Sequence, residues 1–135
     1  MDKKLWKTKG ELDYDYKNDI LFFKSKSRHY EKSIELESFA IDIDKEGFLI
    51  GMQFFDASNF FNLHRDQLLI IKHWKFTAKV NNGKIEINLL FQFIERNKLM
   101  EKNPIIVKAV SEDLPNSEVV CEMWNCWHGI ISLPW

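Results

Sequence analysis

The sequence predicts a mainly β fold with minor α: an antiparallel β meander of hairpins in two parts, with a short helical segment near residues 58–72 between them. Two patterns predict this fold. Apolar and polar residues alternate with the period of a strand on both sides of Asn82-Gly83, and the spacing becomes helical over residues 58–72. The composition agrees, because 45% hydrophobic residues with only 5 Gly and 3 Pro in 135 residues exclude disordered and collagen-like chains.

The first β part, residues 12–57, is predicted from short apolar runs bounded by turn residues. Alternating residues from Leu12 onward, the turn cluster 17–19 and the apolar run after it predict a hairpin over residues 14–23. Residues 33–43 are predicted as one further strand. A tight turn at 44–47, in which Gly47 supplies a positive φ, then leads into the partner strand 48–55.

The helical connector, residues 58–72, is predicted from its start signal and its spacing. Asp56-Ala57-Ser58 is typical of a helix start, because Asp and Ser side chains accept hydrogen bonds from the free amides of a first turn. Apolar residues then recur at helical spacing, and Asp66 is expected to cap a second short helix. The segment is therefore predicted to be one broken helix or two short helices.

The second β part, residues 73–123, contains the clearest local signal. Asn-Gly is the preferred two-residue type I′ turn, and it sets the pairing of the strands on either side. The expected pairs run from Val80 with Ile85 to Trp74 with Phe91, so that every apolar residue meets another on the same face. Residues 95–103 are predicted as a polar turn, 104–110 as a strand, and 118–123 as a last short strand.

Residues 1–135 are expected to form a single domain that ends in a Trp-rich tail. The tail, residues 124–135, carries three of the five Trp and no charged residue. Such a segment has to cover apolar surface somewhere, either on its own sheet or in a contact with another chain. We therefore expect a homodimer, with apolar sheet surface and this tail in or near the contact.

Charge and hydropathy indicate which partners and which cellular compartment to expect. With 19 Lys plus Arg and 20 Asp plus Glu, the formal charge is −1, which does not favour binding to nucleic acid. Lys75, Lys79 and Lys84 could touch phosphates from one face of the second hairpin, but Glu86 interrupts that face. The polar start of the chain and the absence of a long apolar run predict a cytoplasmic protein with no membrane association.

Residues 14–58 resemble a prokaryotic family catalogued as domain of unknown function 2283. The order and spacing of the following residues carry the resemblance: Tyr14, Asp15, Asp19, Leu21, Asp42, Asp44, Gly47, Gly51, Asp56, Ala57 and Ser58. The chain departs from the family pattern at Gln53, where members often have Glu. The resemblance implies no established activity; it implies a second β hairpin region after Ser58, as in longer members, and for small members a place in toxin–antitoxin-like gene pairs.

The same residues also have a purely structural interpretation. Asp side chains stabilise the turns that they flank, a glycine inside a strand marks a bulge or a close backbone approach, and Asp56 or Ser58 would cap a helix. Turn and cap chemistry therefore favours a folding signature over a binding site at these positions.

Metal binding and catalysis find little support in the pattern. Asp42, Asp44, Glu46 and Gly47 resemble the start of a calcium loop, but its last ligand position falls on the neutral Gln53. Cys121, Cys126 and His128 have ligand types that zinc takes, yet a structural zinc site needs four ligands. We expect no cofactor, and no catalytic motif predicts an enzyme.

The function most favoured by the sequence is a non-catalytic protein-interaction module, either self-associating or part of a toxin–antitoxin-like pair. Long apolar strands leave edges that must be covered, and Trp and Phe are favoured in interface cores. The alternative is a β domain that binds a small ligand.

Overall fold

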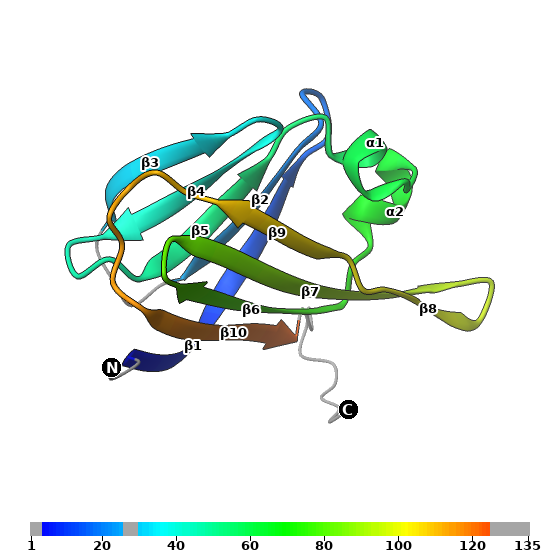
Figure 1. The fold of residues 1–135 in the computed structure, drawn as a ribbon. Coiled ribbons are helices and arrows are strands. Elements are labelled where there is room, and N and C mark those ends of the chain that lie inside the picture. The colour runs from blue at the N-terminus through cyan, green and yellow to red at the C-terminus, as the bar shows by residue number, and fades with distance from the viewer. Residues whose placement is uncertain (1–3, 26–29, 125–135) are drawn as a thin grey trace.

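A computed structural model describes residues 4–25 and 30–124 of the chain. It confirms the predicted fold class, with ten strands in two sheets and two short helices beside one end of them (Figure 1). The neighbouring strands follow the order β3-β4-β5-β2-β1-β10-β6-β7-β8, and β9 also pairs with β7. The elements are β1 Lys4–Asp15, β2 Ile20–Ser25, β3 Tyr30–Leu36, β4 Phe39–Asp44, β5 Leu49–Phe54, α1 Ala57–Phe61, α2 Arg65–Leu69, β6 His73–Asn81, β7 Lys84–Glu95, β8 Lys98–Lys102, β9 Ile105–Ala109 and β10 Ser117–Trp124.

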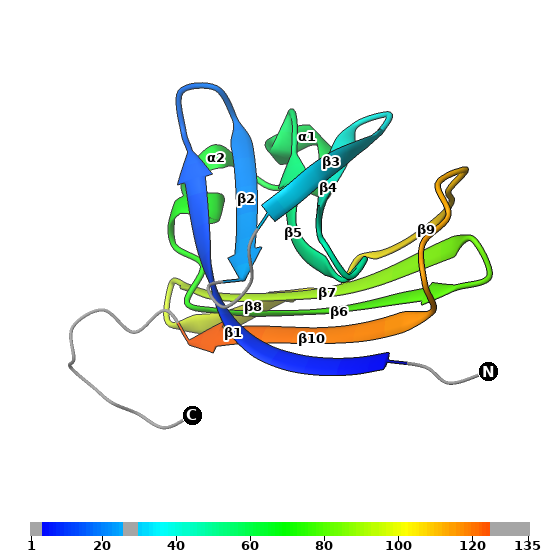
Figure 2. The same cartoon turned by 90° about the vertical axis from the view of Figure 1, so that its left-hand side faces the viewer.

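Strand β1 belongs to both sheets and joins them (Figure 2). Residues 4–9 pair with β10 in parallel, and residues 10–15 pair with β2 in antiparallel register. The change falls at Gly10, where an added Cβ would lie 2.4 Å from the carbonyl oxygen of Lys24 and 2.6 Å from the Cys121 sulfur. Only glycine fits such a close approach of three strands.

The β6–β7 hairpin has the predicted register. Val80 pairs with Ile85, Ala78 with Ile87, and the pairing continues to Trp74 opposite Phe91. The turn residues Asn82 and Gly83 have φ of 51° and 80°, as a type I′ turn requires. The buried face of this hairpin therefore forms the floor of the core, as the alternation predicts.

Two predicted strand boundaries were wrong. Residues 33–43 do not form one strand, because Glu37 adopts a φ of 59° and the chain turns back between β3 and β4. Residues 95–103 are not simply a polar turn either. Arg96 and Asn97, both at positive φ, make a tight turn from which β8 pairs back onto β7. Apolar and polar residues do not alternate along the exposed edge strand β8, so no strand signal is visible there.

The helical connector is two short helices, one of the two forms predicted, but neither is capped as expected. Asp56 precedes α1 with a φ of 52° and makes no side-chain cap bond. Helix α2 is preceded by His64, so Asp66 lies inside its first turn and is not its cap. Of the described helices, none has the length and apolarity needed to cross a membrane.

Aromatic side chains from both sheets fill the core. Phe23 of β2 stacks on Phe91 of β7 with the ring centroids 5.7 Å apart. It also makes edge contacts with Trp74 at 5.0 Å and with Phe76 at 6.1 Å. Helix α1 closes one end, since Phe61 packs against both Phe54 and Phe91 at 5.0 Å. The β1–β2 turn and the two helices thus lie together at this end of the molecule (Figure 1).

Candidate functional site

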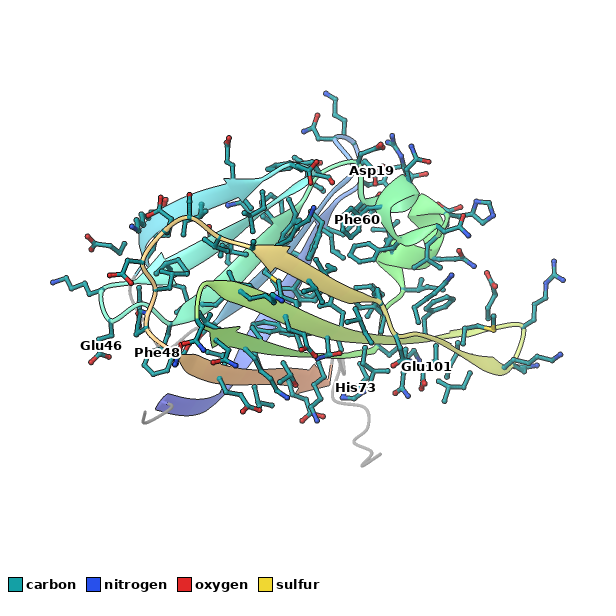
Figure 3. The ribbon with its side chains drawn as sticks, viewed as in Figure 1. Asp19, Glu46, Phe48, Phe60, His73 and Glu101 are labelled. Atoms are coloured by element: carbon teal, nitrogen blue, oxygen red, sulfur yellow. The ribbon has the colours of Figure 1, made fainter. Side chains whose placement is uncertain are left out.

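The family-like residues gather first around Asp19, which is 3% exposed on the turn between β1 and β2 (Figure 3). Its carboxylate accepts a 2.5 Å hydrogen bond from the Tyr14 hydroxyl and a 2.6 Å bond from the Ser58 hydroxyl. The Ser58 amide also donates to it at 3.1 Å, and the Ala57 amide donates to the Asp19 carbonyl at 3.0 Å. Asp19 therefore caps α1 from a distant turn, in place of the local cap that the sequence predicts.

Helix α2 is fastened to the same turn through Arg65. Its guanidinium donates to the carbonyl of Tyr16 at 2.9 Å and lies 3.8 Å from the Asp19 carboxylate. The Tyr16 hydroxyl donates to Asp66 at 3.2 Å. The β1–β2 turn thus holds both helices, each by a different set of polar contacts.

Charge is balanced inside this cluster. Burial disfavours the charged carboxylate of Asp19, but the hydrogen bonds from Ser58 and Tyr14 and the nearby Arg65 outweigh it and lower its pKa. The pKa of Tyr14 is raised, first by burial and then by its hydrogen bond to Asp19. An ionised Asp19 whose oxygens already accept these bonds is an anchor for structure and has little capacity left for proton transfer.

A second group of family-like residues lies around Asp42 and Gly51, which are paired across β4 and β5. The Asp42 carboxylate accepts hydrogen bonds from Ser33 at 2.7 Å and from Gln53 at 3.1 Å. A Cβ on Gly51 would lie 2.6 Å from the Phe23 carbonyl oxygen and 3.1 Å from that carboxylate. Gln53, at which the chain departs from the family pattern, therefore stabilises this pair of strands. Its amide donates a hydrogen bond to Asp42, whereas the carboxylate of a glutamate would repel the Asp42 carboxylate.

A third group forms the β4–β5 turn. The Asp44 carboxylate, 5% exposed, accepts hydrogen bonds from the amides of Glu46 at 3.0 Å and Phe48 at 2.9 Å. Gly47 has a φ of 86°, and a Cβ there would lie 2.4 Å from Pro115. The turn thus packs against the segment before β10, and the carboxylate of Asp44, one of the residues of the calcium-loop pattern, accepts hydrogen bonds from backbone amides.

The other family-like residues have local or core roles. Asp15 accepts hydrogen bonds from the amide and the side chain of Asn18, which lower its pKa. Leu21 and Ala57 are fully buried, and the Asp56 carboxylate accepts a bond from the Asn59 side chain. The structure therefore distributes the motif over turns, strands and the start of α1 and does not bring it into one site.

The weak metal candidates are only partly within the described residues. Cys121 is buried in β10, and this burial raises the pKa of its thiol to about 12. Cys126 and His128 lie outside the described residues. Within residues 4–25 and 30–124, no group of three or more His, Cys, Asp or Glu side chains could hold a metal ion.

A polar network that the sequence did not reveal crosses the outer face of the second sheet (Figure 3). His73, 5% exposed, bonds to Glu122 at 2.8 Å and to Gln92 at 3.0 Å. Gln92 donates to Glu101, which also accepts from Asn103, and these two bonds lower the pKa of Glu101. Side chains from β10, β6, β7 and β8 are thereby joined.

Two of the three lysines considered for phosphate contact, Lys75 and Lys79, have carboxylates as neighbours on that same face. Lys75 is paired in register with Glu122, and Lys79 lies between Glu118 and Glu86. A mixed row of this kind lacks the basic footprint of nucleic-acid binding proteins.

A cleft lies between the two helices and the β7–β8 hairpin. Its volume is about 640 Å³. It is lined by Ser58, Asn59, Asn62, Leu63, His64, Arg65, Gln67, Phe93, Met100, Glu101 and Lys102. Sequence reasoning missed it, because its walls come from the connector and from a hairpin that was predicted as a turn.

Exposed apolar residues lie at two places on the outer side of β7, β8 and β9, with the polar pair Gln92 and Glu101 between them. Odd-numbered residues of β7 are buried, so its even-numbered residues face outward, and Ile94 pairs there with Leu99. Ile105 and Val107 of β9 pair with Asn88 and Glu86 on the same side. The exposed fractions of the four apolar residues are 40% for Ile94, 57% for Leu99, 65% for Ile105 and 54% for Val107. We call these four residues the outer stripe.

Comparisons with known proteins agree with the resemblance seen in the sequence. Residues 11–58 match the family described as protein of unknown function (DUF2283). A Methanosarcina mazei protein named "Putative hypoxanthine phosphoribosyltransferase" is 32% identical over 116 residues, covering 86% of this chain and 94% of that protein. An uncharacterized protein of Methanocaldococcus jannaschii is 29% identical over 114 residues, covering 83% and 97%. No solved structure matches.

Proposed function

We propose that this chain, which belongs to the family described as protein of unknown function (DUF2283), is a non-catalytic, cytoplasmic protein-interaction module that forms a homodimer. The outer stripe is the observation that carries the proposal. Its four large apolar side chains lie 40% to 65% exposed, three of them on β8 and β9 at the edge of the sheet, where natural proteins place charges to prevent pairing. An apolar edge of this kind is stabilised when a second chain covers it.

A two-fold axis is the simplest way to cover the outer stripe, because a self-complementary patch then buries itself. Full burial of a large apolar side chain is worth roughly 1.5–3 kcal/mol, so four on each protomer supply a substantial driving force. A different protein, such as the second member of a toxin–antitoxin-like pair, could cover the same stripe.

Sedimentation equilibrium tests the homodimer. The wild-type chain should sediment with about twice the 16.1 kDa mass of one chain at micromolar concentration. The double variant Ile105→Lys/Val107→Lys should sediment as a monomer, because two charges on each protomer would meet across the contact. Tyr30→Lys is the matched control: it is 61% exposed on β3, outside the outer stripe, and should leave the dimer intact. A wild-type mass of 16.1 kDa at all concentrations would contradict the proposal.

The cleft beside α1 and α2 favours a second candidate, a small-ligand binder. Its volume of about 640 Å³ lies within the range of ligand pockets, and apolar and polar side chains mix on its walls. The name of the Methanosarcina mazei relative suggests the first compounds to test, hypoxanthine and phosphoribosyl compounds.

Thermal unfolding with and without these compounds separates the two candidates. A ligand that binds only the folded chain raises its melting temperature, and Lys102→Ala in the wall of the cleft should abolish that rise. Unchanged melting temperatures at millimolar hypoxanthine and phosphoribosyl compound would argue against the second candidate and leave the first unaffected.

A further inference from the structure

A groove lies between β3 and the chain that leaves β9. β3 is the first strand in the order of neighbouring strands, and β9 pairs only with β7 among the described strands. The groove has a volume of about 810 Å³ and is lined by residues 33–36 on one side and 109–112 on the other. We call this groove the open seam. In Figure 1 the chain that leaves β9 passes beside β3.

The two sides of the open seam run antiparallel to each other. The Lys32 ammonium lies 3.0 Å from the Glu112 carboxylate at one end, and Lys108 pairs with Glu37 at the other. Residue numbers therefore rise along β3 while they fall along the opposite side. The backbone ladders of β3 and β9 are made with β4 and β7, on the sides away from the seam.

This arrangement suits one additional strand. Strands on either side of an inserted strand lie about twice the 4.8 Å strand spacing apart, and the long side chains of a lysine–glutamate pair can span such a distance. Both lysine–glutamate pairs are partly exposed to solvent, so opening either costs little.

The floor of the open seam is apolar and its rim is polar. Ile34, Leu36 and Val110 are half-buried and pack against the core, whereas Ser33 and Glu35 between them are exposed. An inserted strand would place every second side chain on this floor and the others toward solvent.

The rim carries an excess of negative charge. Acidic residues around it are Glu31, Glu35, Glu37, Glu112 and Asp113, against the two basic residues Lys32 and Lys108, a net charge of −3. The two lysines are already matched by glutamates. The side chains of an incoming strand that face solvent would therefore be favoured if they were basic.

We propose that the open seam binds an extended segment of a partner protein as an added β-strand, in which apolar side chains alternate with lysine or arginine. A second copy of this chain fits poorly, because pairing β3 with β3 would set Glu31 and Glu35 against the same residues. The proposal deepens the proposed interaction function but uses a different surface, since the outer stripe points away from the core that floors the seam.

Selection from a displayed library of random decapeptides tests the proposal. The full-length Ile105→Lys/Val107→Lys variant serves as the target, so that self-association cannot mask the seam. Enriched peptides should alternate apolar residues with lysine or arginine. Their binding should shift the amide resonances of β3 and of residues 109–112, and N-methylation of central peptide bonds should abolish it, because an added strand bonds through its backbone.

Charge reversal on the rim supplies the matched pair of variants. Glu35→Lys should weaken the selected peptide at least tenfold, and Asp13→Lys, an exposed charge reversal on β1, should leave its affinity unchanged. No enrichment, enriched acidic peptides, or resonance shifts centred outside β3 and residues 109–112 would overturn the proposal. Self-association is tested independently of peptide binding, by sedimentation of the wild-type chain.

Discussion

The Ser58 hydroxyl donates a 2.6 Å hydrogen bond to the carboxylate of Asp19, which lies 39 residues earlier in the chain. The bond joins the β1–β2 turn to the first turn of α1, and Tyr14 and Arg65 approach the same carboxylate. The family-like pattern from Tyr14 to Ser58 therefore marks a contact between two ends of a folding unit.

Replacing Asp19 should destabilise the fold. Asp19→Asn keeps the shape but removes the charge and part of the accepting capacity, so we expect a loss of about 1–3 kcal/mol in the free energy of unfolding. Urea denaturation measures it, with Asp13→Asn as the exposed control. Ser58→Ala should be coupled to Asp19→Asn in a double-mutant cycle, and strict additivity would refute a direct interaction.

The same carboxylate should make the fold sensitive to acid. Its pKa is lowered in the folded chain, so it contributes stability above the ordinary Asp pKa of about 3.9, and this contribution is lost as the pH falls through the folded pKa. Denaturation between pH 5 and pH 2 should show a steeper loss for wild type than for Asp19→Asn. Equal slopes would show that Asp19 titrates normally.

Tyr14 should have the opposite dependence at high pH. Its pKa is raised in the folded chain, so its contribution to stability is complete below the ordinary Tyr pKa of about 10 and is lost as the pH rises above that value. Tyr14→Phe should remove this component of alkaline destabilisation. Phenolate absorbance measures the titration directly, and a wild-type chain in which all three tyrosines ionise near pH 10 while still folded would contradict it.

Gly10 should tolerate no side chain. Gly10→Ala places a Cβ against the Lys24 carbonyl and the Cys121 sulfur, and overpacking of this kind costs roughly 1–3 kcal/mol. Gly83→Ala is the informative comparison, since its nearest atom is 3.7 Å away and only its φ of 80° is unfavourable. Thermal unfolding should show the larger loss for Gly10→Ala, and the reverse order would contradict the close approach at the bend of β1.

The thiol of Cys121 should not react with thiol reagents in the folded protein. Burial raises the pKa of its thiol to about 12, so very little thiolate exists at neutral pH and reagents cannot reach it. In a Cys126→Ser background, a thiol reagent should modify Cys121 only after denaturant is added. Rapid modification of the native chain would show that β10 is more open than its packing indicates.

Much of the fold could be predicted because its signals are local. Asn82-Gly83 fixed the β6–β7 register, and alternation located most strands. The parallel pairing of β1 with β10 joins residues more than 100 positions apart, and no local pattern reports it. The same limit applies to Asp19: its turn position was visible in the sequence, but its role as a cap for α1 depends on the tertiary fold. The outer stripe and the open seam were missed because both depend on β8, β9 and the split between β3 and β4.

The proposed dimer contact can be tested directly by following backbone amide resonances as the protein is diluted. If the outer stripe is the contact, dilution should shift resonances of β8 and β9 and of the outward residues of β7, and leave β3 and β4 unchanged. Spectra that do not change from millimolar to low micromolar concentration, while sedimentation gives a single-chain mass, would contradict self-association, and shifts centred on β3 and β4 would place the contact elsewhere.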